Sequence, residues 1–180
     1  MPAIVIPYRG DAKRRLSSRL RAAVAVAMLG DVVEAALAVG AVLVVTDDPT
    51  VVPRGAEVVP DPGRGLDAAV TAGLARVSGH ALVVNADLPS ATPASLRWLA
   101  GAGLALVEAA DGTTNALSLP QPDVFEPRYG AGSASRFRAS APYATVAIPE
   151  LELDVDADDD LERLAGRLGR RTRALLAVPA

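Results

Sequence analysis

The 180-residue sequence contains no cysteine and a single histidine, His80. The absence of thiols excludes disulfides, cysteine nucleophiles and cysteine-bound metals. His80 stands at the start of an apolar run, and we interpret it as structural, which leaves little support for Ser-His or Cys-His catalysis. The sequence also lacks an apolar run of the roughly 18–20 residues that cross a bilayer, and its N-terminus lacks a signal-peptide pattern. We therefore expect a cytoplasmic protein without a membrane partner.

Aromatic residues are scarce, at 3% of the chain against an apolar share of 51%. The core must therefore consist mainly of Ala, Val, Leu and Ile, which suits a sheet covered by helices on both faces. Long basic blocks are also missing. The net charge is -3, and only the segment 13–15 and the C-terminal stretch are basic, so we expect a small-molecule partner and no nucleic acid. The length favours one compact domain of residues 1–180.

Short aliphatic runs alternate with segments of helical spacing along the chain. The sequence predicts strands at 3–7, 41–46, 57–59, 81–85, 104–107, 115–119, 143–148 and 151–155. It predicts helices at 19–38 and 66–77, and others beginning near 92, 133 and 158. Alternating strands and helices of these lengths indicate βαβ units. We therefore expect an α/β fold with a largely parallel sheet.

Carboxylates follow two of the predicted strands. Asp87 comes directly after the apolar run that begins at Ala81, and Asp154 and Asp156 alternate at the end of the last predicted strand, so they would share one face. The carboxyl edge of an open sheet is where α/β folds bind ligands. Carboxylates gathered there could hold Mg²⁺ beside a phosphate-bearing substrate. The alternative for Asp87 is that it caps the turn that follows.

Several polar positions could bind anions. Lys13 is the only lysine, and its compact ammonium could meet a phosphate; alternatively, it is a solvated residue at a helix start. Three glycine-containing segments, 61–67, 112–115 and 129–133, expose backbone N–H groups or hydroxyls that suit phosphate or carboxylate oxygens. The alternative for each is an ordinary turn or helix cap. The acidic run 158–160 is assigned to a helix start, where it favours the helix dipole.

Seven motifs, taken in order, resemble one protein family. They are Ala12-Lys13-Arg14-Arg15-Leu16, Val44-Val45-Thr46, Pro60-Asp61-Pro62-Gly63-Arg64-Gly65-Leu66, Ala86-Asp87-Leu88-Pro89, Gly112-Thr113-Thr114-Asn115-Ala116-Leu117, Tyr129-Gly130-Ala131-Gly132-Ser133 and Leu153-Asp154-Val155-Asp156. The set resembles the 2-phospho-L-lactate or phosphoenolpyruvate guanylyltransferases of coenzyme F-420 biosynthesis. This resemblance implies a three-layer, Rossmann-like fold of the nucleotide-diphospho-sugar transferase type.

The resemblance also implies an activity and a set of site residues. The activity would be transfer of GMP from GTP to the phosphate of phosphoenolpyruvate or 2-phospho-L-lactate, with release of pyrophosphate. The implied roles are Lys13 and Asp87 in catalysis, Lys13, Gly63, Gly65 and Asp67 in nucleotide binding, Thr114, Gly130 and Ser133 in binding the phosphorylated three-carbon acid, and Asp87, Asp154 and Asp156 in binding Mg²⁺.

This chemistry agrees with the residues that the chain lacks. The acceptor phosphate is already an anionic nucleophile, so catalysis needs positioning and charge neutralisation rather than a histidine or cysteine base. Three positions depart from the family pattern: the short loop after residue 7, Asp67 in place of asparagine, and Phe137 in place of histidine. We expect these departures to bear on nucleotide preference more than on the metal site.

The sequence leaves two other functions open. The chain could transfer a nucleotide to another phosphorylated acceptor, such as a sugar phosphate or molybdopterin, or it could be a nucleotide-binding homologue without turnover. It also leaves open the choice between phosphoenolpyruvate and 2-phospho-L-lactate, because both carry a carboxylate and a phosphate.

Overall fold

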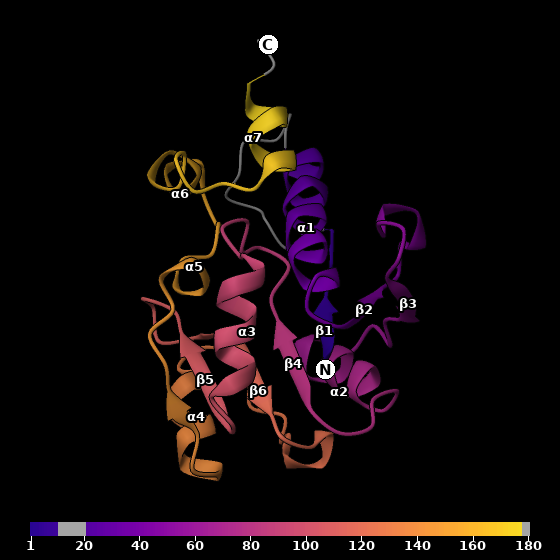
Figure 1. Cartoon of the computed structure of the whole chain (residues 1–180), viewed down its shortest axis with the longest axis vertical. Coiled ribbons are helices and arrows are strands. Elements are labelled where there is room, and N and C mark those ends of the chain that lie inside the picture. Colours follow the sequence, from indigo (N-terminus) through magenta and orange to yellow (C-terminus); the bar gives the residue numbers. More distant parts are fainter. Residues whose placement is uncertain (11–20, 178–180) are drawn as a thin grey trace.

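A seven-stranded sheet forms the centre of the molecule (Figure 1). The computed structural model describes residues 1–10 and 21–177. Its strands are β1 (Ala3–Pro7), β2 (Ala41–Thr46), β3 (Glu57–Pro60), β4 (Ala81–Val84), β5 (Ala105–Glu108), β6 (Thr114–Leu119) and β7 (Ala144–Thr145). The strand order is β3-β2-β1-β4-β6-β5-β7. Every pairing is parallel except those of β6, which runs antiparallel to both β4 and β5.

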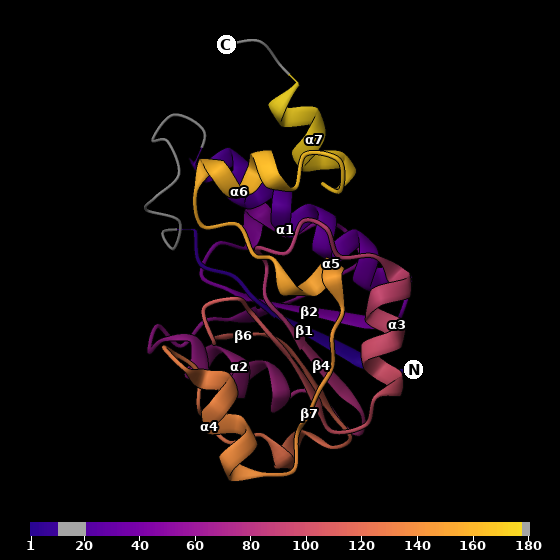
Figure 2. The ribbon, with the colours of Figure 1, turned by 90° about the vertical axis from the view of Figure 1, so that its left-hand side faces the viewer.

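Helices cover both faces of this sheet and give three layers (Figure 2). One face carries α1 (Arg21–Leu37), α3 (Pro93–Gly101) and α5 (Pro149–Glu152); the other carries α2 (Leu66–Leu74) and α4 (Ser133–Ser140). Ile4 and Ile6 pack into the first core and Val5 into the second, as alternation along β1 requires. Both faces are apolar, which explains why the strands are continuous aliphatic runs. The predicted fold class is thereby confirmed.

Helix α2 lies unusually close to the sheet at Gly73. A Cβ atom at this position would lie 2.4 Å from Cγ1 of Val5 and 2.9 Å from Cγ2 of Val45. Real Cβ atoms do not approach other heavy atoms so closely, so a glycine is required for the helix to sit at this depth. The contact fixes how closely the C-terminal end of α2 approaches β1 and β2.

The antiparallel strand β6 brings its first residues to the edge where β1 and β4 end. Val84 pairs with Ala116, and the N–H of Asn85 donates to the carbonyl of Asn115 at 3.0 Å. Thr114, the first residue of β6, therefore lies at the carboxyl edge of the parallel strands. Two short 3-10 helices, at Pro49–Val51 and Pro122–Val124, lie in the connections.

The last two predicted strands are largely wrong. Residues 143–148 contain only the two-residue β7, and residues 151–155 form the end of α5 followed by an irregular segment. The buried apolar residues here are Ile148, Leu151 and Val155, whose spacing of three and four is helical rather than alternating. Pro149 stands at the first turn of α5, a position that suits proline.

Two short helices near the C-terminus lie outside α1, on its side away from the sheet (Figure 2). They are α6 (Asp158–Arg163), which begins where the sequence predicts, and α7 (Arg170–Leu176), which the sequence did not predict separately. The carboxylate of Asp160 accepts the N–H groups of Asp156 and Ala157, at 3.0 and 2.9 Å. This confirms the assignment of the acidic run to a helix start.

The carboxylate of Asp31, in α1, attaches α7 to the rest of the molecule. It accepts the N–H groups of Arg171 and Thr172 at 2.8 and 2.9 Å, and the N–H of Gly169 donates to the carbonyl of Pro89 at 2.7 Å. A third apolar cluster joins α1 to Val155, to α6 and to the residues between α6 and α7; its members are Val24, Met28, Val155, Leu161, Leu164 and Leu168. Among the described residues, no helix is both long and apolar enough to span a membrane.

Candidate active site

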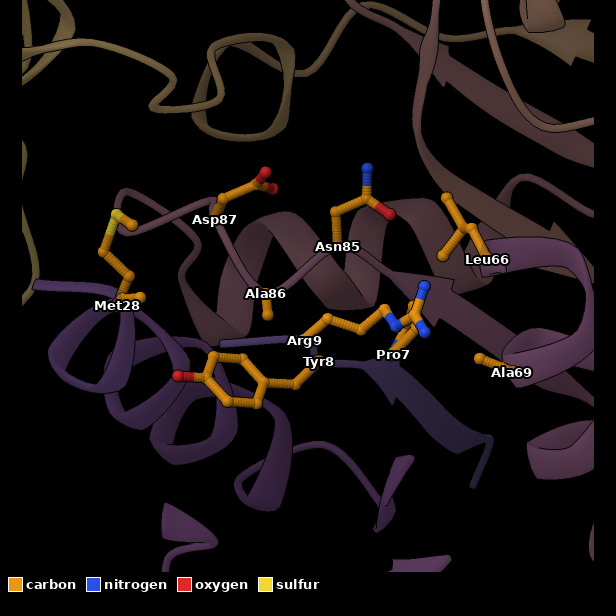
Figure 3. A pocket seen from close by; sticks show the side chains of 10 residues that line it. Pro7, Tyr8, Arg9, Met28, Leu66, Ala69, Asn85, Ala86 and Asp87 are labelled. Atoms are coloured by element: carbon orange, nitrogen blue, oxygen red, sulfur yellow. The ribbon is translucent and has the colours of Figure 1, made fainter. Parts of the chain in front are cut away.

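A pocket of about 190 Å³ opens where β1 and β4 end (Figure 3). Its lining residues come from the end of β1, from the segments that follow β1 and β4, and from the N-terminal halves of α1 and α2. They are Pro7, Tyr8, Arg9, Ala25, Met28, Leu66, Ala69, Asn85, Ala86 and Asp87. The carboxyl edge of a parallel sheet is the usual ligand site of an open α/β fold, and the pocket lies there.

Three aspartates converge at this edge. Asp87, Asp154 and Asp156 each offer a carboxylate oxygen, and these oxygens all lie within 4.8 Å of one another. The N–H of Val155 donates to the carbonyl of Asp87 at 3.1 Å, which joins the two segments through their backbones. The predicted convergence of these residues is therefore confirmed. The predicted cause was wrong, because Asp154 and Asp156 lie in an irregular segment rather than on a strand.

The donor set of this cluster fits a hard divalent cation. Mg²⁺ and Mn²⁺ prefer carboxylate and other oxygen ligands, and three carboxylates offer enough negative charge to hold one. Asp87 also lines the pocket, so a cation bound by the cluster would lie beside a ligand in that pocket. In Figure 3, Asp87 and Asn85 project from the segment after β4.

A second group of predicted residues meets at the start of β6. The buried hydroxyl of Ser133 donates to Oγ1 of the buried Thr114 at 3.0 Å, and the N–H of Ser133 donates to the carbonyl of Gly130 at 3.0 Å. Gly130 has a φ of 113°, which favours glycine. The structure thus brings Thr114, Gly130 and Ser133 together, as the family resemblance implied.

We call residues 128–133 the acid loop, because the predicted acid-binding residues Gly130 and Ser133 lie in it. Arg136, on α4, is hydrogen-bonded to the backbone of this loop. Its guanidinium donates to the carbonyls of Arg128, Tyr129 and Ala131. These bonds use the carbonyl oxygens of the loop, whose negative partial charge would oppose an anion. Arg136 therefore helps to make the loop compatible with an anionic ligand.

The glycine-rich segment 61–67 is organised by Asp61. Its buried carboxylate pairs with Arg9 at 3.1 Å and accepts the N–H of Gly63 at 2.8 Å. Gly63 and Gly65 have φ values of 72° and 90°, so both positions favour glycine. These two glycines do not line the pocket themselves; Leu66, directly after them, does.

Asp67, in the first turn of α2, is hydrogen-bonded to the acid loop. Its Oδ1 atom accepts the backbone N–H of Tyr129 at 3.0 Å. Lys13, the remaining predicted site residue, lies outside the described residues.

Sequence reasoning missed several residues that shape the site. Tyr8 and Arg9 line the pocket, and Asn85 donates from Nδ2 to the carbonyl of Thr114 at 3.2 Å, which links the pocket to the start of β6. The available signal was their position directly after β1 and β4. Burial raises the pKa of the Tyr8 phenol, so its hydroxyl stays protonated at neutral pH. His80 instead lies at the opposite edge, with Nε2 3.1 Å from Oγ of Ser118.

Comparison with known proteins identifies the family. The family model described as "Guanylyl transferase CofC like" matches residues 2–164. The chain belongs to this guanylyl transferase family. The phosphoenolpyruvate guanylyltransferase of Geodermatophilus obscurus is 41% identical over 169 residues, covering 86% of this chain and 79% of the relative. That of Sphaerobacter thermophilus is 37% identical, covering 90% and 91%.

Solved structures agree with this membership at the level of the fold. A candidate nucleotide-diphospho-sugar transferase from Desulfovibrio desulfuricans superposes with a TM-score of 0.71 at 18% identity, covering 97% of this chain and 93% of that one. The CofC-like chain therefore has the three-layer nucleotidyltransferase fold that its sequence predicts.

Proposed function

We propose that this guanylyl transferase moves GMP from GTP to the phosphate of phosphoenolpyruvate and releases pyrophosphate, in a magnesium-dependent step of coenzyme F-420 biosynthesis in the cytoplasm. The similar proteins of G. obscurus and S. thermophilus carry the name of this activity. The acid 2-phospho-L-lactate is the alternative acceptor, since it has the same carboxylate and phosphate and differs by one double bond.

The observation that carries the proposal is the cluster of three aspartates beside the pocket. Carboxylate oxygens within 4.8 Å of one another, at the edge where β1 and β4 end, suit a reaction between two phosphate-bearing substrates. Two anions repel each other, so their reaction requires positive charge between them. A cation on Asp87, Asp154 and Asp156 would supply that charge by neutralising phosphate oxygens.

The residues of the chain would divide the substrates between them. The pocket formed by the segments after β1 and β4 would take the nucleotide, with Leu66 and Ala69 of α2 as one wall, the turn of Gly63 and Gly65 next to that wall, and Lys13 at the triphosphate. Thr114, Gly130 and Ser133 would bind the acid. These residues orient a phosphate oxygen of the acid toward the α-phosphorus of GTP.

The chemical step needs no base from the protein. An oxygen of the acceptor phosphate forms a bond to the α-phosphorus, while the bond from that phosphorus to the oxygen bridging it to the β-phosphate breaks, and the bridging oxygen leaves with pyrophosphate. The acceptor is ionised at neutral pH, so no proton has to be removed from it. Catalysis would come from positioning and charge stabilisation.

The test is a pyrophosphate-release assay with GTP, Mg²⁺ and either phosphoenolpyruvate or 2-phospho-L-lactate. We expect release with phosphoenolpyruvate, none without an acid, and none after chelation of the metal by EDTA. Faster release of pyrophosphate with 2-phospho-L-lactate would show that this acid, the alternative acceptor, is the substrate. Release with a sugar phosphate, and with neither acid, would show a nucleotidyltransferase of another specificity and reject the proposal.

A further inference from the structure

A hydrogen bond joins α2, the helix beside the proposed nucleotide pocket, to the acid loop. Asp67 is the second residue of α2, and Oδ1 of its carboxylate accepts the N–H of Tyr129 at 3.0 Å. The two residues are far apart in the sequence. Figure 2 shows that α2 and α4, which follows the acid loop, lie on the same side of the sheet.

The rest of the acid loop is held by other contacts. The guanidinium of Arg136 donates hydrogen bonds to the carbonyls of Arg128, Tyr129 and Ala131. The hydroxyl of Ser133 donates to that of Thr114. The ring of Tyr129 packs edge to face against Phe137, with ring centroids 5.3 Å apart. These contacts fix the carbonyls, the ring and the end of the loop, whereas Asp67 fixes the Tyr129 N–H directly before Gly130.

The hydrogen bond between Asp67 and Tyr129 bears on which of two roles Asp67 has. A carboxylate at the edge of a nucleotide pocket could read the guanine by accepting its N–H groups, or it could act through the protein. Oδ1 is already engaged by a backbone donor of the acid loop. Asp67 also does not line the pocket, whose lining residues from α2 are Leu66 and Ala69.

We infer that Asp67 is a positioning residue for the acid rather than a reader of the guanine. It holds the peptide between Arg128 and Tyr129, and through it Gly130, in the conformation that receives the phosphorylated acid. This inference rests on the proposed function, because it assumes that the acid loop binds the acceptor. The hydrogen bond requires an acceptor atom at Oδ1 but does not require a charge.

The test uses two variants of Asp67 that differ in this acceptor. In Asp67→Ala the acceptor is lost, so KM for phosphoenolpyruvate should rise about tenfold, while KM for GTP stays within about twofold. In Asp67→Asn an amide oxygen replaces Oδ1 and the charge is removed, so KM for phosphoenolpyruvate should remain within about twofold of that of the wild type. Asp123→Ala, which removes a carboxylate from an exposed position, is the matched control.

Nucleotide preference tells the two roles apart. Inosine triphosphate lacks only the 2-amino group of GTP, and both Asp67 variants should keep the preference of the wild type between these two nucleotides. A preference reduced about tenfold in Asp67→Asn would show that the carboxylate reads the base and would overturn the inference. An unchanged KM for phosphoenolpyruvate in Asp67→Ala would overturn it as well.

A readout that does not depend on turnover completes the experiment. Hydrogen exchange of the Tyr129 amide, followed by NMR, should be faster in Asp67→Ala and close to the wild-type rate in Asp67→Asn. Unchanged exchange in Asp67→Ala would overturn the positioning role. A wild-type protein that releases no pyrophosphate would reject the proposed function instead, and the exchange of Tyr129 would still decide the role of Asp67.

Discussion

At the scale of single residues, the acidic cluster depends on an apolar side chain. Val155 is fully buried in the third apolar cluster, and its N–H is bonded to the carbonyl of Asp87. Asp154 and Asp156 flank this buried residue on either side. Burial of one valine therefore places two carboxylates beside a third, and the site needs no regular strand to assemble.

We predict that Asp154→Asn removes most of the activity. Losing one of three carboxylates weakens the hold on the cation, and a deficit of several kcal/mol in the stabilisation of transition-state charge lowers the rate of pyrophosphate release about a hundredfold or more. Asp159→Asn is the control, because Asp159 is an exposed residue of the neighbouring helix α6. Equal rates in the two variants would remove Asp154 from the site.

The single histidine allows a test of a partly buried environment at the other edge of the sheet. Burial lowers the pKa of His80 below 6.5. The folded protein then binds fewer protons than the unfolded chain, so this contribution to stability is present above pH 6.5 and is lost as the pH falls toward the folded-state pKa. NMR titration of the His80 ring should give a midpoint below 6.5. His80→Asn should lose this part of the pH dependence; a midpoint above 6.5 would contradict the expectation.

At the scale of the elements, two helices set the walls of the site. Helix α2 brings Leu66 and Ala69 to the pocket, and its depth is fixed where Gly73 touches the sheet. Helix α1 contributes Ala25 and Met28 to the pocket, and it also receives α7 through Asp31. The stability of these helix contacts therefore bears directly on the shape of the site.

The packing of α2 predicts a difference between two glycines. Gly73→Ala would place a methyl group against Val5 and Val45 and should lower the free energy of unfolding by about 1–3 kcal/mol. A Cβ atom at Gly101, in α3, would meet nothing within 4 Å, so Gly101→Ala should be neutral or stabilising by up to about 1 kcal/mol. Urea unfolding of both variants measures this, and equal effects would contradict the close packing of α2.

The attachment of α7 predicts a difference between two acidic residues of α1. Asp31→Ala would leave the N–H groups of Arg171 and Thr172 without their acceptor and should cost about 1–3 kcal/mol of stability. Glu34→Ala removes exposed ion pairs of 3.5 and 3.4 Å to Arg170 and Arg171 and should cost less than about 1 kcal/mol. Thermal unfolding separates the two, and a larger loss for Glu34→Ala would refute the argument.

At the scale of the whole molecule, the site is formed by segments that are distant in the sequence. The segment that carries Asp154 and Asp156 returns to the loop after β4, where Val155 bonds to Asp87 and Gly169 to Pro89. Binding of a metal and a nucleotide would draw these segments together, because the proposed ligands lie on both sides of the contact. Ligand binding should therefore stabilise the molecule as a unit.

We predict that GTP with Mg²⁺ raises the melting temperature more than GTP with EDTA. A ligand at about 100 times its dissociation constant stabilises the folded state by about 2.7 kcal/mol. The metal-dependent part of this shift should be reduced in Asp154→Asn and retained in Asp159→Asn. A shift of the same size with and without Mg²⁺ would argue against a metal at the three aspartates.

The aliphatic runs predicted the strands at 3–7, 41–46 and 81–85, because strands buried on both faces must be continuously apolar. The same rule failed for the predicted strands at 143–148 and 151–155, because the apolar spacing from Ile148 to Val155 is helical and a proline stands at the first turn of the short helix α5. The spacing of apolar residues predicts secondary structure reliably where a segment packs against one core. This segment instead packs first against the first core and then against the third cluster.

Composition and order of residues by themselves determined the α/β class, the absence of thiol chemistry and the three aspartates of the cluster. These properties can be read from local patterns, because the periodicity of a segment and the chemistry of a side chain do not depend on contacts with distant parts of the chain. Only the tertiary structure decided that Val155 joins the two acidic segments, that β6 runs antiparallel and brings Thr114 to the ligand edge, and that Asp67 reaches Tyr129. Each of these depends on contacts between distant segments, and the free energy of such contacts is set by packing that no local pattern records.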